Sequence, residues 1–291
     1  PHLDFAINRS VREIEGIDTE VINRIYENAN GVEVEQVFPK QELKGNNYYV
    51  LKNGNASVLA CYDPVRRVIR KVEKPNVFGI YPKNAEQAFA VDALLNPNIQ
   101  LVAISGKAGT GKTLLALASA LQQNKQYEFI YLARPIVALS SKDLGFLPGD
   151  VNEKVDPYMQ PLYDNLGFIK RRFNIHGAEN RLIEEMQKEQ KLMISALAYI
   201  RGRSLSDVYF IVDEAQNLTP HEVKTIITRA GEGTKMVFTG DIDQIDSPYL
   251  DKKSNGLSHL FDKMQGQDIF AHVHLEKGER SKLADLASDL L

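Results

Sequence analysis

The residues best suited to chemistry form the run Gly106-Lys107-Ala108-Gly109-Thr110-Gly111-Lys112-Thr113, which has the pattern G-x-x-x-x-G-K-[ST]. In such a run the glycines let successive backbone N–H groups converge on an anion, and the N-terminus of the following helix adds its dipole. Lys112 can then reach the terminal phosphates of a nucleoside triphosphate, and the hydroxyl of Thr113 can ligate Mg²⁺. A strand-like run precedes this loop and a helical run follows it, so we predict that it binds a nucleoside triphosphate.

A pair of adjacent carboxylates follows the apolar run 208–212. Asp213, at the tip of this predicted strand, can hold Mg²⁺ beside Thr113. Glu214 is placed to polarise a water molecule for attack on the γ-phosphate, which hydrolysis requires and binding alone does not. A strand that merely ends in charged turn residues is the alternative, and the P-loop upstream makes that alternative the weaker one.

A third apolar run ends in Thr239-Gly240-Asp241-Ile242-Asp243-Gln244. In a P-loop sheet, the strand beside the Asp-Glu strand carries a polar residue that senses the γ-phosphate. Thr239, Asp241 or Gln244 can serve, and we place Asp241 among the nucleotide-binding residues and Gln244 among the catalytic ones. By itself the pattern is weak because Gly-Asp turns are frequent.

These runs belong to a series in which predicted strands alternate with predicted helices. The strands are expected at 101–105, 129–133, 208–212, 235–239 and 269–275, and the helices at 113–123, 179–188, 220–230, 256–264 and 281–291. Such alternation predicts an α/β fold with a parallel sheet covered by helices on both faces. The ligand of such a sheet lies beyond the carboxyl ends of its strands, where the residues above fall.

Residues 1–82 have a different texture, and we expect a small β-rich domain and a linker there, followed by the nucleotide domain at 83–291. A helix is expected at 18–29, and short β-like runs at 32–38, 48–52, 56–62 and 68–72. Asn53-Gly54 between two of these runs is a hairpin signal. The basic edge formed by Arg66, Arg67, Arg70 and Lys71 is more typical of a solvated surface than of a nucleic-acid site.

The nucleotide domain opens with a predicted helix capped by Asn84. Gln87 lies near its start, where the side-chain amide can pair with a donor and an acceptor on the edge of adenine. An exposed glutamine on the helix surface is an equally good interpretation of the sequence.

The segment at about 140–206 interrupts the alternation and is expected to project from the core as an insertion. Its basic runs Lys170-Arg171-Arg172 and Arg201-Gly202-Arg203 form the best local surface for nucleic acid. Tyr158, Tyr163, Phe168 and Phe173 can stack on bases, but packing of the insertion is the favoured interpretation.

Bulk composition narrows the remaining possibilities. The net charge of −3 provides no overall attraction to nucleic acid, so any such binding must use a local surface. The lone Cys61, the lack of a long apolar run and the lack of a signal peptide favour a cytoplasmic protein without a membrane span. A first residue other than Met favours a fragment with further sequence upstream. His272 and His274 share a strand face without a third ligand nearby, so we do not expect a metal site there.

The chain resembles the PhoH family of P-loop ATPases, and in particular the ATPase half of the type in which a PIN ribonuclease domain precedes this module. Besides the P-loop, the matching segments are PKNAEQ at 82–87, ARPIV at 133–137, LGFLPGD at 144–150, RGR at 201–203, DEAQN at 213–217, GD at 240–241 and ERS at 279–281. The resemblance covers about 80–291, and the part before it matches more loosely. No PIN domain is present in this sequence, so nuclease activity is not expected of it.

The resemblance implies a RecA-like core close to superfamily 1 helicases, hydrolysis of ATP with Mg²⁺, hexameric rings and action on RNA. Gln87 is similar to the adenine-reading glutamine of helicase-type ATPases. Arg280 matches an arginine of the family that acts across a subunit interface; on the sequence alone it would be a solvated residue at the start of a helix.

The leading hypothesis is therefore a nucleic-acid-stimulated ATPase, a ring-forming motor or helicase on single-stranded RNA. With one P-loop and one Asp-Glu strand, the chain lacks the second core that completes the site of a two-core helicase, so a homo-oligomer is expected. Two alternatives remain open. One is a P-loop phosphotransferase, in which Glu214 activates the hydroxyl of a small acceptor. The other is a nucleotide-gated scaffold or binding module with marginal hydrolysis.

Overall fold

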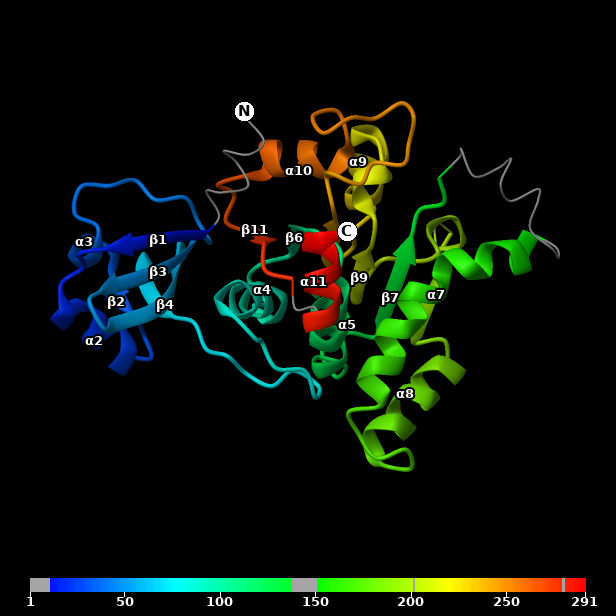
Figure 1. The fold of residues 1–291 in the computed structure, drawn as a ribbon, viewed down its shortest axis with the longest axis horizontal. Coiled ribbons are helices and arrows are strands. Elements are labelled where there is room, and N and C mark those ends of the chain that lie inside the picture. The colour runs from blue at the N-terminus through cyan, green and yellow to red at the C-terminus, as the bar shows by residue number, and fades with distance from the viewer. Residues whose placement is uncertain (1–10, 138–150, 201, 279–280) are drawn as a thin grey trace.

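The computed structural model describes residues 11–137, 151–200, 202–278 and 281–291, in which the chain forms a small and a large β-sheet (Figure 1). Arg201, Arg280 and the LGFLPGD motif, all singled out above, lie outside the described residues.

The large sheet has six strands in the order β11-β6-β10-β9-β7-β8, and every pairing is parallel. Its strands are β6 (Leu101–Gly106), β7 (Phe129–Arg134), β8 (Leu192–Ala196), β9 (Val208–Val212), β10 (Lys235–Gly240) and β11 (Phe270–Leu275). The predicted α/β fold with a parallel, helix-covered sheet is confirmed. In addition, β10 lies between the P-loop strand β6 and the Asp-Glu strand β9, as the third motif predicted.

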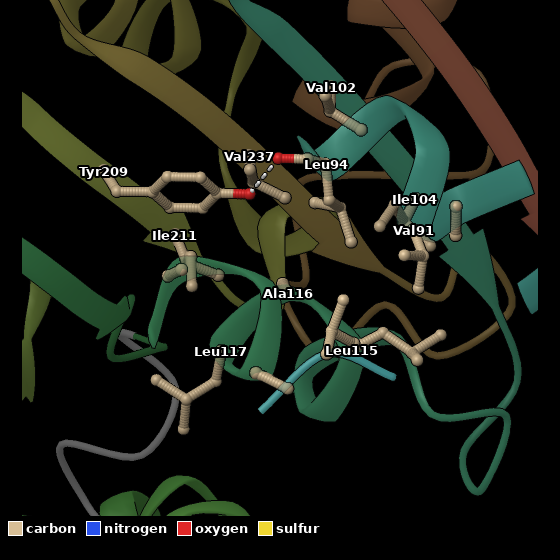
Figure 2. Packing of buried hydrophobic residues seen from close by; sticks show 14 of the residues in the cluster. Val91, Leu94, Val102, Ile104, Leu115, Ala116, Leu117, Tyr209, Ile211 and Val237 are labelled. Carbon is tan, nitrogen blue, oxygen red and sulfur yellow. Dashed lines mark hydrogen bonds between the residues drawn. The ribbon is translucent and has the colours of Figure 1, made fainter. Parts of the chain in front are cut away.

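Helices cover both faces of this sheet because the apolar side chains of each strand alternate between the faces. Val102 and Ile104 of β6 pack into the core under α4 and α5, whereas Leu101 and Ala103 pack into the core of the opposite face. Figure 2 shows the first of these cores from nearby. The helices are α4 (Ala85–Leu95), α5 (Lys112–Gln122), α7 (Val151–Lys170), α8 (Ala178–Lys188), α9 (Pro220–Ile227), α10 (Gly256–Met264) and α11 (Lys282–Leu290).

The stretch expected as a projecting insertion contributes an edge strand to the large sheet and a helix that packs against it. β8 pairs with β7 from Ile130↔Leu192 to Arg134↔Ala196, and α7 contacts both α5 and β8. The expectation that 140–206 as a whole projects from the core is therefore wrong. The apolar run of β8 is short, and the two helices that separate it from β7 concealed its place in the alternation.

Side chains from the sheet hold the end of α4. A helix leaves its last carbonyls without partners inside the helix, and here they accept from neighbouring strands and from α5. The ammonium of Lys235 donates to the carbonyls of Ala93 (2.6 Å) and Asn96 (2.8 Å). The Tyr209 hydroxyl donates to the carbonyl of Leu94 at 2.9 Å (Figure 2). Burial lowers the pKa of Lys235 to about 7. These bonds fix the helix that carries Gln87.

The small sheet has the order β1-β3-β4-β5-β2, antiparallel except where β1 runs parallel to β3. Its elements are β1 (Val11–Glu15), α2 (Thr19–Glu27), β2 (Val32–Glu33), α3 (Val34–Val37), β3 (Tyr48–Asn53), β4 (Ala56–Asp63) and β5 (Val68–Lys71). The Asn53-Gly54 hairpin is confirmed between β3 and β4. The strand predicted at 32–38 is wrong beyond its first two residues: Val34 and Val37, one helical turn apart, are both buried and form a short helix instead.

An ion pair joins the small sheet to α4. The guanidinium of Arg70 donates from both terminal nitrogens to the carboxylate of Asp92, each at 2.8 Å, and the Tyr48 hydroxyl donates to the same carboxylate at 3.0 Å. The Tyr48 ring also stacks on Phe89 with a centroid distance of 5.0 Å. Arg70 therefore serves an internal contact.

We expect Asp92→Ala to lower the free energy of unfolding by about 3 kcal/mol, because it leaves the half-buried Arg70 charge without its partner. Glu35→Ala, which removes the exposed partner of Arg67, should cost less than about 1 kcal/mol. Urea unfolding followed by circular dichroism measures both changes. Equal losses in the two variants would contradict the proposed weight of the Arg70–Asp92 pair.

No helix in the described part of the chain is both long and apolar enough to cross a membrane.

Candidate nucleotide site

The P-loop leaves β6 and enters α5 in a conformation that needs its glycines. A Cβ on Gly106 would lie 2.5 Å from the carbonyl oxygen of Leu275, so no larger residue fits. Gly111 precedes α5 with a φ of +89°, which is costly for residues that carry a Cβ. The Thr110 hydroxyl closes the loop by donating to the carbonyl of Lys107 at 2.7 Å. The result is a cradle of backbone at the N-terminus of a helix, as anion binding requires.

The ammonium of Lys112 lies over this loop and donates to the carbonyl of Lys107 at 2.9 Å. Burial lowers its pKa, whereas the charges of Asp213, Glu214 and Asp241 oppose that shift. A partly desolvated cation beside an open anion cradle can bind the terminal phosphates of a nucleotide.

Two hydroxyl groups, one from helix α5 and one from β10, meet at the carboxylate of Asp213. Its Oδ1 accepts from the Thr113 hydroxyl (2.7 Å) and from the Thr239 hydroxyl (2.9 Å), and these hydroxyls lie 3.2 Å apart. Mg²⁺ prefers oxygen ligands and takes one or two carboxylates together with phosphate oxygens. The Thr113–Asp213 pair therefore fits the predicted magnesium site, and Thr239 supports it from β10.

Arg134, which the sequence analysis did not single out as a site residue, completes this group. Its Nε and Nη2 donate to Asp213 Oδ2 at 3.0 and 2.7 Å, and its Nη1 donates to the carbonyl of Tyr158 at 2.9 Å. Nη2 also lies 3.6 Å from Oε1 of Glu214. Arg134 ends β7, the strand paired with β9, so a cation at the tip of the predicted strand 129–133 was the available signal.

Glu214 follows Asp213 in a left-handed conformation, with a φ of +56°. Burial raises the pKa of its carboxyl group and Asp213 raises it further, whereas Arg134, Gln216 and Lys112 lower it. A carboxylate with a raised pKa beside a phosphate site can act as a general base.

Gln216 connects Glu214 to the end of β10. Its fully buried amide donates to the carboxylate of Glu214 and to the backbone carbonyl of Gln244, and it accepts from the N–H of Asp241 at 3.2 Å. A Cβ on Gly240 would lie 2.3 Å from the Gln216 oxygen, so the close approach requires glycine there. Gln216 belongs to the DEAQN motif, but its connecting role was not predicted.

The residues predicted on the third strand end differ in their positions. The Thr239 hydroxyl donates directly to Oδ1 of Asp213. Asp241 is buried, and its carboxylate accepts from the N–H of Asp243 at 2.9 Å. Gln244 contributes its backbone carbonyl to Gln216, while its side chain is exposed. Neither Asp241 nor Gln244 lines the pocket described next.

A pocket of about 510 Å³ collects most of these groups, within the range typical of small-molecule sites. It is lined by Gly79, Ile80, Tyr81, Lys83, Gln87, Gly109, Gly111, Lys112, Thr113, Leu114, Leu115, Arg134, Asn165, Phe168, Arg172, Asp213 and Glu214. The structure thus brings the P-loop, the Asp-Glu pair and Gln87 to one cavity.

Gln87 is buried, with an exposed fraction of 5%, so the interpretation as an exposed helix glutamine is wrong. Its oxygen accepts from the N–H of Lys83 (2.9 Å), and its nitrogen donates to the carbonyl of Thr110 (3.1 Å). A primary amide has two N–H groups and two lone pairs, so one of each remains for a ligand.

His272 and His274, on β11, contact the residue that precedes the P-loop. Both rings lie within hydrogen-bond distance of the Ser105 hydroxyl, His272 Nε2 at 3.0 Å and His274 Nδ1 at 2.8 Å. Burial lowers the pKa of His272 to about 3, so its ring is neutral at ordinary pH. Ser105 directly precedes Gly106, and the pair of imidazoles fixes the point where the strand turns into the loop.

Comparison with known proteins agrees with this geometry. Residues 79–289 match the PhoH family, described as "PhoH-like protein". The chain is 46% identical over 254 residues to "Protein PhoH2" of Bacillus subtilis, covering 84% of this chain and 56% of that protein. It is 43% identical over 174 residues to the "PhoH-like protein" of the same organism, covering 59% of this chain and 51% of that protein. The chain thus spans about half the length of the curated relatives it matches.

Among solved structures, the chain is similar to the Pif1 helicase from Candida albicans, with 18% identity and a TM-score of 0.38 over 71% of this chain and 42% of that one. This likeness is too weak to carry an inference.

Arg134→Ala should raise the pKa of the Glu214 carboxyl group, because the arginine charge lowers that pKa. Arg134→Lys keeps the charge and should keep most of this lowering. Lys83→Ala serves as a control, because Lys83 lines the pocket without contributing to the pKa of Glu214. Titration of the carboxyl group by NMR measures the change in each variant. An unchanged pKa in Arg134→Ala would contradict the coupling.

Proposed function

This chain belongs to the PhoH family and has a P-loop NTPase fold, and we propose that it hydrolyses ATP with Mg²⁺ in a reaction coupled to binding of single-stranded RNA. One observation carries the proposal: Lys112, Thr113, Asp213 and Glu214 converge on one pocket at the carboxyl edge of the sheet.

Each group then has a distinct task. The loop N–H groups and Lys112 bind the β- and γ-phosphates, and Thr113 and Asp213 hold Mg²⁺. The ion supplies charge neutralisation at the phosphate oxygens when bound. Glu214 accepts a proton from the attacking water, and Gln216 fixes the direction of its carboxylate. Gln87 uses its remaining donor and acceptor on the edge of adenine.

Completion of the site is proposed to come from a second copy of the chain. Among the described residues, the cations that line the pocket are Lys83, Lys112, Arg134 and Arg172. Arg134 is committed to Asp213, and Arg172 donates to the carbonyl of Gly79 at 3.0 Å. We propose that a further cation for the γ-phosphate arrives from elsewhere. We assign this role to Arg280 of a neighbouring subunit in a homo-oligomeric ring, a hexamer by resemblance.

The RNA surface is proposed at the RGR segment, 201–203. Arg203, the last residue of this segment, lies in the connection between β8 and β9, where its carbonyl accepts from the Arg229 guanidinium at 3.2 Å. The two arginines of the segment supply the local positive charge that binding to RNA phosphates needs. Of the other basic run, Arg172 is already bonded to the linker.

Two variants separate binding from turnover. Lys112→Ala should weaken ATP binding, whereas Glu214→Gln should keep binding and lose turnover by roughly 10²- to 10⁴-fold, the usual contribution of a general base. Calorimetry and phosphate release, each with and without single-stranded RNA, measure these effects. Turnover of Glu214→Gln within a few-fold of the parent would remove Glu214 as the base. Consumption of ATP only after a small hydroxyl acceptor is added would indicate a phosphotransferase, and ATP-dependent assembly without hydrolysis a scaffold.

Mixing two inactive variants tests the subunit interface. Arg280→Ala should bind ATP, assemble and lose turnover by roughly 10³- to 10⁵-fold, the range known for arginine fingers. Glu214→Gln chains keep the finger and lack the base, so mixed rings contain some interfaces with both groups intact. Activity should partly return after subunit exchange, which native mass spectrometry confirms. Exchange without recovery would overturn the assignment in trans.

A further inference from the structure

The pocket extends beyond the phosphate loop into a compartment built from two segments distant in sequence. One wall is the linker at 79–83, and the other is the last part of α7, with Asn165 and Phe168, together with Arg172 in the turn after the helix. Leu114 and Leu115 of α5 add an apolar surface between them. This compartment adjoins the phosphate cradle through Gln87, whose Nε2 donates to the carbonyl of Thr110 at 3.1 Å. A nucleotide whose triphosphate lies in the phosphate cradle therefore has its other end in this compartment.

Two aromatic rings line this compartment and stay exposed. Phe168 has an exposed fraction of 43% and Tyr81 one of 57%. Two other aromatic rings nearby in sequence pack against each other instead of lining the pocket. Phe78 and Phe173 lie edge to face with a centroid distance of 5.2 Å. Exposed aromatic rings that line a pocket are suited to a flat apolar ligand. The sequence analysis favoured packing for Phe168, and the structure instead leaves its ring at the pocket.

Hydrogen bonds hold the linker to the turn after α7 and to α5, so this compartment is preformed. Arg172 Nε donates to the carbonyl of Gly79 at 3.0 Å, and the N–H of Phe78 donates to the side chain of Gln122 at 2.9 Å. Gly79 has a φ of +84°, and a Cβ there would lie 2.9 Å from the ring of Phe173. The hydroxyl of Tyr81 accepts from Asn76 at 3.1 Å, which limits rotation of its ring. A preformed site avoids the entropic cost of ordering on binding.

We propose that the linker at 79–83 and residues 165–172, from the end of α7 and the turn after it, form the nucleobase subsite, in which the rings of Phe168 and Tyr81 stack on the base. The inference rests on the proposed function, since the triphosphate end places the base here. Aromatic faces, an apolar floor and the amide groups of Gln87 and Asn165 match a heterocycle with polar edges. The stretch expected as a nucleic-acid-binding insertion thus contributes to nucleotide recognition.

Binding of ATP and of inorganic tripolyphosphate to the full chain separates the base from the phosphates. Phe168→Ala and Phe168→Leu should weaken ATP on the order of 10-fold, the effect of losing one aromatic stacking partner. Both should leave the affinity for tripolyphosphate unchanged. Phe168→Tyr keeps an aromatic face and should bind ATP like the parent. Calorimetry provides the dissociation constants, and thermal melting confirms that each variant is folded.

Tyr163→Ala is the matched control. Tyr163 lies on the same helix with the same exposed fraction of 43%, and its hydroxyl donates to the carbonyl of Ile194 at 3.2 Å, away from the pocket lining. Its ratio of ATP to tripolyphosphate affinity should equal that of the parent. An equal loss of both ligands in Phe168→Ala, or no loss of either, would overturn the subsite. Base-dependent binding without hydrolysis would support the subsite and contradict the proposed ATPase, so the two failures are distinct.

Discussion

The carboxylate of Asp213, which directly follows β9, bonds to side chains from two other strands and from α5, and the site depends on that convergence. Thr113 reaches it from α5, Thr239 from β10 and Arg134 from β7. A buried carboxylate is costly unless charges and hydrogen bonds compensate it, and these three groups supply both. Because Glu214 is the next residue, the same anchoring places the general base of the proposed reaction beside the phosphate cradle.

Helix α4 connects the large sheet to the pocket. Its carboxyl end is held by Lys235 and Tyr209, and near its amino end Gln87 bonds to the P-loop. Asp92, on the same helix, receives Arg70 from the small sheet. The small sheet is thus attached to the helix that carries Gln87, which gives it a physical route to influence the pocket, although none of its described residues before the linker lines that pocket.

The crossover between β7 and β8 changes the functional interpretation of the middle of the chain. As a projecting insertion, its aromatic and basic residues would serve nucleic acid or their own packing. In the observed fold, the end of α7 instead lines the pocket with Phe168, and Arg172, in the turn after it, donates to the carbonyl of Gly79 in the linker.

The sequence by itself determined the phosphate loop, the Asp-Glu pair, the parallel α/β class and the caps of α4, since each follows from local spacing or from chemistry that few residue types provide. Only the tertiary structure decided what distant segments do together. Arg134 reaches Asp213 because β7 pairs with β9. Gln216 bonds to Asp241 because the end of β10 lies beside it. Two prolines, Pro157 and Pro161, hid α7 by acting as helix-breaking signals that the packed fold tolerates. The compartment beside Gln87 arises from a linker and a helix distant in sequence, and no local pattern encodes such contact.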